Sequence, residues 1–270
     1  MGIDHVAVVE EYSGFFTEAV EGNLAAPVPS CPGWTVDDLV AHLAEVQAWW
    51  TAVVLAKGAY PDEEAARRAS DTGPDRVEGW REISARYVAV QHEYLRHAGP
   101  DAPVWVWWND EGRDTAAALA SRQAHEAVVH CWDAQRAADK VKPIPAELAA
   151  DGVDEFLERF LHGEEWTAGP AVLELVATDT GARWWLGTDG TTTPKWLAGG
   201  ALAGGGSAGG ELAGGGSRPG EYAADAVDAR VAGTAEQLYL LLWRRLGMGE
   251  VTVTGDDVTV EALLGWPNLT

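Results

Sequence analysis

The chain has 270 residues, of which 47% are apolar, so it can bury the core of one large domain or two ordinary ones. It carries 19 lysines and arginines against 42 aspartates and glutamates, and the net charge of −23 argues against nucleic acid and anionic membrane surfaces as partners. No apolar run is long enough to span a membrane, and residues 1–14 lack the pattern of a signal peptide, so we expect a cytoplasmic monomer or homodimer.

The N-terminal part of the chain predicts helices separated by proline and glycine. Residues 5–23 predict a first helix, and three prolines and a glycine make residues 25–34 an extended loop. Thr35 is a favourable N-cap for a second helix that ends before Gly58. After a polar connection, a third long helix is expected over residues 75–97.

His42 lies beside the apolar stripe of the second helix. Leu39, Leu43, Val46 and Trp50 follow one another at spacings of four, three and four, which is typical of one buried helix face. Because His42 stands three residues after Leu39 and four before Val46, we expect its side chain to face inward. A core histidine with one backbone hydrogen bond is the alternative to a metal ligand.

Residues 103–109 are extended and dense in tryptophan. Tryptophan offers a large apolar face and one hydrogen-bond donor, which suits the wall of a pocket. We expect Trp105, Trp107 and Trp108 to contact a bound cofactor, with simple core packing as the alternative.

A fourth long helix is expected over residues 113–140, a segment without glycine or proline. Glu126 and His130 are four residues apart and therefore project from one face, whereas His125 points away from His130. With His42 on the inner face of another helix, Glu126 and His130 form a candidate metal site with three ligands. A histidine capped by a carboxylate in the core is the alternative interpretation.

Four further side chains lie close to this candidate site in the sequence or share its motifs. Arg122 is one turn before Glu126, and Asp133 is a candidate acceptor for an imidazole N–H, although plain ion pairing on the helix face explains both equally well. We expect Cys31 to be buried as a packing residue, and Cys131 to lie outside the metal site because it is about 100° around the helix from His130.

The second half of the chain predicts a different architecture. Lys140 to Pro145 mark a domain boundary, so that residues 1–142 form a helical bundle and residues 143–270 a small α+β domain. A Gly/Ala/Ser-rich segment at about 197–219 predicts a flexible loop. The expected helices are 146–161, 234–246 and 258–264, and the expected strands are 171–177, 182–187, 226–231 and 251–254, with a turn at 178–181.

Three stretches of this sequence resemble the mycothiol-dependent maleylpyruvate isomerase family. They are VPSCPGWTVDDLVAHL, from Val28 to Leu43; RQAHEAVVHCWD, from Arg122 to Asp133; and GTAEQLYLLLWRR, from Gly233 to Arg245. The resemblance implies a DinB-like four-helix bundle followed by an α+β domain of the SCP2-like type.

The family resemblance also implies chemistry at particular residues. It makes His42, Glu126 and His130 the ligands of a divalent metal, which in the family is usually zinc, and it makes Arg245, or alternatively Arg244, important for activity. The implied function is isomerisation or S-transfer on a small electrophilic substrate that bears a carboxylate, with mycothiol as the low-molecular-weight thiol cofactor. Two alternatives remain, namely a metal-dependent hydrolase that uses a metal-bound water and a non-catalytic protein that binds a small molecule.

Overall fold

The computed structural model describes residues 2–108, 111–161, 169–189, 195–200, 227–267 and 269. The chain forms two compact units, Met1–Lys142 and Pro143–Thr270, which are described here one at a time. In the part of the chain that the structure describes, no helix is long and apolar enough to cross a membrane.

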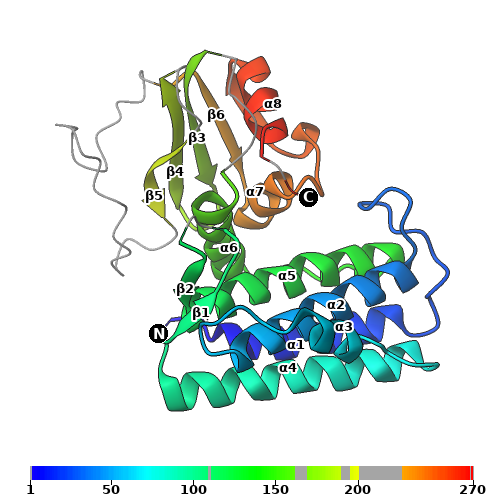
Figure 1. Ribbon diagram of the computed structural model, residues 1–270. Helices are drawn as coiled ribbons and strands as arrows, with labels where there is room; N and C mark the ends of the chain where they lie inside the picture. The colour runs from blue at the N-terminus through cyan, green and yellow to red at the C-terminus, as the bar shows by residue number, and fades with distance from the viewer. Residues whose placement is uncertain are drawn as a thin grey trace. The chain divides into compact units, whose positions relative to one another are not determined.

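The N-terminal unit is a bundle of four long helices. Figure 1 shows these helices side by side, with α1 and α5 packed together and α4 against both α1 and α2. A short helix, α3, and a two-stranded hairpin connect them. The elements are α1 (His5–Val20), α2 (Val36–Leu55), α3 (Glu63–Ala69), α4 (Arg76–Ala98), β1 (Pro103–Trp105), β2 (Arg113–Thr115) and α5 (Ala116–Ala137).

Side-chain caps determine where the bundle helices begin. Thr35 closes a capping box at the start of α2, because its hydroxyl accepts from the backbone N–H of Asp38 while the Asp38 carboxylate accepts from the backbone N–H of Thr35. Asp75 and Thr115 cap α4 and α5 in the simpler way, each accepting from a backbone N–H three residues on. The predicted N-cap at Thr35 is therefore confirmed.

The predicted fourth helix began three residues too early. Arg113–Thr115 pair with Pro103–Trp105 in an antiparallel hairpin, so α5 starts at Ala116. The register Val104↔Asp114 buries Val104 completely, and Ala116 and Leu119 of the following helix join the same apolar cluster. Burial of the hairpin against the bundle outweighs the helix propensity of residues 113–115.

The C-terminal unit has the expected α+β architecture. Its sheet has the strand order β5-β4-β3-β6-β7, in which β3 and β6 are parallel and the other neighbours are antiparallel (Figure 1). The elements are α6 (Ala146–Arg159), β3 (Pro170–Ala177), β4 (Arg183–Asp189), β5 (Lys195–Gly200), β6 (Ala229–Gly233), α7 (Ala235–Leu242), the 3-10 helix η2 (Met248–Glu250), β7 (Thr252–Gly255) and α8 (Asp257–Gly265).

Alternation along β3 explains how this unit forms its core. Leu173 and Leu175 are buried on one face of the sheet, where they meet Phe156 of α6, Leu242 of α7 and Leu263 of α8 around a small apolar cavity. The predicted turn between β3 and β4 is confirmed, with Gly181 in the left-handed region at φ +75°.

The predicted glycine-rich loop was placed slightly too early. Residues 197–200 belong to β5, which pairs with β4 in an antiparallel register with a shift between Trp185 and Leu186. Pairing with a long, well-formed strand is the physical reason that a segment of weak strand propensity is extended. The rest of the predicted loop, residues 201–219, lies outside the described residues.

Helix α7 ends four residues before its predicted end at 246. Its C-terminus is a Schellman motif, in which the N–H of Arg244 donates to Leu241 O (2.9 Å) and the N–H of Arg245 donates to Leu240 O (2.8 Å). Arg244 takes the left-handed position at φ +59°, which glycine usually occupies. Arginine does not indicate a turn in a sequence, so the apolar pattern predicted a helix that continues past Leu242.

Candidate metal site

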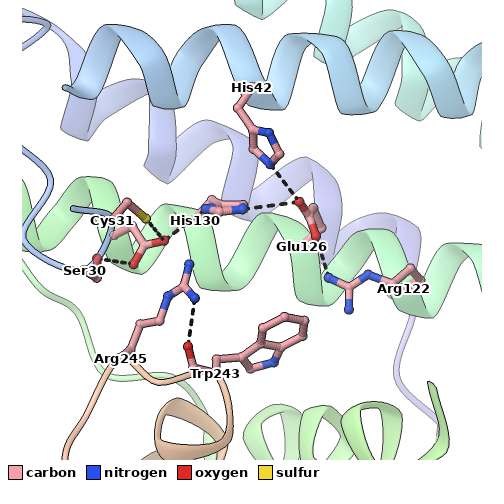
Figure 2. A network of polar contacts seen from close by, with 9 residues as sticks. Ser30, Cys31, His42, Arg122, Glu126, His130, Trp243 and Arg245 are labelled. Atoms are coloured by element: carbon pink, nitrogen blue, oxygen red, sulfur yellow. Dashed lines mark hydrogen bonds and ion pairs between the residues drawn. The ribbon is translucent and has the colours of Figure 1, made fainter. Parts of the chain in front are cut away.

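The structure brings His42, Glu126 and His130 together inside the N-terminal unit. His42 comes from α2, and Glu126 and His130 come from successive turns of α5, a helix that packs against α2. The Nε2 atoms of both histidines lie 3.3 Å from Glu126 Oε1 (Figure 2). The histidine ring centroids are 4.9 Å apart, so two imidazole nitrogens and one carboxylate oxygen converge on one point.

This donor set fits a divalent metal ion. Ligands at about 2.0–2.2 Å from a tetrahedral zinc stand about 3.3–3.5 Å from one another, which matches the two distances of 3.3 Å. Two histidines and one carboxylate are also a ligand set of catalytic zinc sites, which keep a position open for water or substrate. The exposed fraction of the His42 side chain is 32%, so the site is reached from solvent on that side.

Arg122 and Asp133 contact the two candidate ligands on α5. Arg122, whose side chain is 3% exposed, donates from Nη2 to Glu126 Oε2 at 2.6 Å, which leaves Oε1 to face the histidines. Asp133 is fully buried, and its Oδ2 lies 3.0 Å from His130 Nδ1. A carboxylate that accepts from Nδ1–H fixes the ring so that the Nε2 lone pair points at a metal.

The same contacts shift the pKa values of Glu126 and His130. Burial alone would raise the pKa of Glu126, but its hydrogen bonds with His130 and His42 and the charge of Arg122 lower that pKa well below its usual value. Burial alone would lower the pKa of His130, but the carboxylates of Asp133 and Glu126 raise it to about 9. Without metal at neutral pH, Glu126 is therefore ionised and His130 carries a proton on each ring nitrogen.

Metal binding at neutral pH is consequently expected to release a proton. His130 must lose the proton on Nε2 to become a ligand, so we expect about one proton per bound cation at pH 7, and an apparent affinity that rises about tenfold per pH unit until the pH reaches about 9. Calorimetric titration with zinc in two buffers of different ionisation enthalpy measures this proton. Equal binding enthalpies in both buffers would contradict the assignment of His130.

The three tryptophans of the predicted cofactor pocket lie along the hairpin region of the bundle. Trp105 packs edge-on against Trp49 and Tyr60, with ring centroids 5.8 and 5.0 Å away. Trp108 packs against Trp50 and donates from Nε1 to Asp114 at 2.8 Å, and Trp107 is 46% exposed.

His42, the candidate ligand on α2, is distant along the helix from these packing contacts. Trp50 follows His42 by eight residues, which corresponds to about 12 Å along α2. Core packing therefore accounts for the observed contacts of Trp105 and Trp108, and a cofactor contact at these residues stays a prediction.

The two consecutive arginines of the C-terminal unit have different environments. The Arg244 guanidinium donates to the backbone carbonyls of Leu264, Gly265 and Pro267 at 2.6–3.2 Å, so it closes the C-terminal end of α8. Arg245 is half-buried, and its Nη1 donates to Trp243 O at 2.8 Å (Figure 2). Of the two arginines, Arg244 thus has a structural task that explains its presence.

The loop before α2 supplies contacts that sequence reasoning missed. Ser30 Oγ donates to Asp133 Oδ1 at 2.5 Å, and the Trp34 ring meets the His42 ring edge-on at 5.2 Å between centroids. Cys31 was expected to be buried, but it is partly exposed, and its Sγ donates to Asp133 Oδ2 at 3.7 Å. The side chain of Cys31 thus contacts a polar acceptor 102 residues away in sequence.

The other cysteine behaves as expected from its place on the helix. Cys131 is 1% exposed, and burial raises the pKa of its thiol to about 12. Such a thiol stays protonated at neutral pH, so it is a poor nucleophile.

Comparisons with known proteins agree with this arrangement. A family model described as the mycothiol maleylpyruvate isomerase N-terminal domain matches residues 7–135, and the model of the C-terminal domain of that family matches residues 147–262. The sequence has no significant match among curated proteins.

Two solved structures share the fold over nearly their whole length. The crystal structure of the mycothiol-dependent maleylpyruvate isomerase has a TM-score of 0.56 and 15% identity, covering 93% of this chain and 92% of that one. A histidine-to-alanine mutant of mycothiol-dependent maleylpyruvate isomerase has a TM-score of 0.55 and 14% identity, with the same coverage. With both family domains matched in order, the chain belongs to the mycothiol maleylpyruvate isomerase family of enzymes.

Proposed function

We propose that this protein is a metal-dependent isomerase that uses mycothiol, or a thiol of the same kind, on a small electrophilic acid. The observation that carries the proposal is the convergence of His42 Nε2, His130 Nε2 and Glu126 Oε1 on one point, in a chain whose two domains both match the family. When bound in such a site, a divalent cation supplies Lewis acidity that lowers the pKa of a neighbouring thiol.

The residues around the ligands prepare the site for that cation. The positive charge of Arg122 balances the charge of Glu126 and engages its second oxygen, so that Oε1 is available as a ligand. Asp133 holds the Nδ1 proton of His130, which leaves Nε2 as the ligand atom. Both supports lie on α5 with the residues they serve, so they are in place before a metal arrives.

The substrate class follows from chemistry and charge. Cis–trans isomerisation needs the double bond to become a single bond for the time of one rotation, and reversible thiol addition to an alkene conjugated with a carbonyl group achieves this. An acidic protein needs a local cation to bind a carboxylate, and we assign that role to Arg245. Arg244 is the weaker choice, because its donors already serve three backbone carbonyls.

A thiol-dependence assay tests this function. The zinc-loaded protein is mixed with cis-configured unsaturated dicarboxylic acids, with and without mycothiol, and formation of the trans isomer is followed by ultraviolet absorbance and NMR. We expect turnover that requires both metal and thiol and that leaves the thiol concentration unchanged. Loss of free thiol with formation of a stable conjugate indicates S-transfer instead, and thiol-independent consumption of an ester or amide indicates a hydrolase.

A further inference from the structure

The segment that joins α1 to α2 is a short, internally bonded loop, which we call the entry loop (residues 24–35). Its two arms meet where Val28 N donates to Trp34 O at 2.9 Å, and its tip is closed by bonds from Cys31 N to Val28 O (3.1 Å) and from Trp34 N to Cys31 O (3.0 Å). Gly33, at φ +89°, makes this tight return possible. The loop then runs directly into the capping box of α2, and Asp37 N donates to Leu24 O at 2.9 Å, so its backbone is held at both ends.

The tip of the entry loop contacts the carboxylate that orients His130. Ser30 Oγ donates to Asp133 Oδ1 at 2.5 Å, and Cys31 Sγ donates to Asp133 Oδ2 at 3.7 Å. The second of these oxygens, Oδ2, is the one that lies 3.0 Å from His130 Nδ1. A bond to each oxygen sets both the position and the rotation of a carboxylate that lies fully buried.

The base of the same loop contacts the other histidine. The rings of Trp34 and His42 are 5.2 Å apart at an interplanar angle of 62°, an edge-to-face contact that limits rotation of the imidazole. His42 has the most exposed side chain of the three candidate ligands, so it loses the most rotational freedom when it binds a metal. Contact with Trp34 removes part of that freedom beforehand.

We infer that the entry loop is a positioning element for the metal site, with Ser30 acting on His130 through Asp133 and Trp34 acting directly on His42. This inference rests on the proposed metal site and goes beyond it, because neither Ser30 nor Trp34 belongs to the three candidate ligands. One loop thereby restrains two histidines that belong to different helices. Its effect is expected in metal affinity and coordination geometry, in addition to any stability lost when the buried Asp133 loses a hydrogen bond.

Cobalt binding to the full-length protein tests the role of Ser30. Dissociation constants are measured by competition with a chromophoric chelator, and the visible d–d spectrum reports the coordination geometry. We expect Ser30→Ala to raise the dissociation constant about tenfold, at the lower end of the effect of losing an outer-shell partner, and to change the d–d bands. Ser30→Thr keeps the hydroxyl and is expected to remain within about twofold of the wild type.

Two comparisons separate this role from a general effect of the substitution. Ser70→Ala removes a hydroxyl that bonds to the backbone of α3, so it serves as the matched control with unchanged affinity. In an Asp133→Ala background, Ser30→Ala is expected to add less than about twofold, because the carboxylate through which it acts is gone. Thermal unfolding of each metal-free variant shows whether the fold is intact.

The outcomes distinguish this inference from the proposed function. If His130→Ala loses cobalt while Ser30→Ala keeps the wild-type affinity and spectrum, the positioning role is wrong and the metal site stands. If Ser30→Ala is as harmful in the Asp133→Ala background as alone, the hydroxyl acts by another route and the inference is overturned. If the wild-type protein binds no cobalt, both the site and its positioning loop are wrong.

Discussion

His42→Ala and His130→Ala are each expected to weaken metal binding roughly a hundred- to a thousandfold. Structural zinc sites with four protein ligands bind with about 10–16 kcal/mol, so one ligand contributes about 2.5–4 kcal/mol. At that loss, protein purified without added metal should contain well under a tenth of an equivalent, and turnover that depends on added thiol should fall to the background rate. Elemental analysis of the purified variants, followed by zinc titration, measures both affinities.

Of the two, His42→Ala is the cleaner test of metal binding. The side chain of His42 is 32% exposed, whereas His130 is 12% exposed and its loss leaves the buried Asp133 without an imidazole partner. Part of the effect of His130→Ala is therefore expected to appear as lower stability of the metal-free protein. Glu126→Gln has a related defect, since it leaves the buried Arg122 facing a neutral amide.

A histidine elsewhere on the bundle provides the matched control. His97 lies in the last turn of α4, is 59% exposed and contacts Glu93 at 2.9 Å. Because this pair is at the surface, His97→Ala is expected to change neither stability nor metal content measurably. Stoichiometric metal in His42→Ala, at an affinity equal to that of His97→Ala, would show that the three-ligand assignment is wrong.

Arg245→Met is expected to lower kcat/KM for a carboxylate substrate roughly a hundredfold. A hydrogen bond to a charged group contributes about 1.5–3 kcal/mol, which corresponds to about ten- to a hundredfold for one bond and more for a bidentate pair. Metal content should not change, since Arg245 is not one of the proposed ligands. Steady-state kinetics on an unsaturated acid and on its methyl ester measure the effect. We expect kcat/KM to fall for the acid and to stay unchanged for the ester.

The neighbouring arginine is the natural control, because it has the same charge and a different task. Arg244→Met removes the donors to Leu264, Gly265 and Pro267, so we expect a loss of about 1–2 kcal/mol in the free energy of unfolding and near-normal kinetics while the protein is folded. Arg244→Gly loses the same bonds but relieves the left-handed backbone at φ +59°, so it should be more stable than Arg244→Met by about 1 kcal/mol. If Arg244→Met loses activity and Arg245→Met does not, the two assignments must be exchanged.

The local sequence pattern was sufficient to predict much of the fold. The apolar stripe at Leu39, Leu43, Val46 and Trp50, and the N-cap at Thr35, predicted α2, and the structure has that helix where it was expected. The change from long helices to short strands after Lys142 predicted the α+β character of the second half. These signals are readable because helix periodicity and capping involve residues three or four apart.

Boundaries were less predictable where tertiary contacts override propensity. Arg113–Thr115 look helical in isolation, yet they form a strand because a hairpin with Pro103–Trp105 buries Val104. Arg244 ends α7 in a backbone conformation that usually requires glycine, and its side chain closes the end of a helix about twenty residues further on. Neither feature leaves a local signal in the sequence.

For the candidate site, the sequence by itself determined that Glu126 and His130 share one helix face, because a spacing of four places them one turn apart. Only the tertiary structure decided that His42, 84 residues from Glu126, directs Nε2 at the same carboxylate oxygen, and that Ser30 reaches Asp133 across 103 residues. Spacing along a helix dictates neighbours within one turn, whereas contacts between helices and loops depend on how the whole bundle packs. The candidate ligands could thus be proposed from pattern and resemblance, but the contacts of the entry loop with Asp133 and His42 could not.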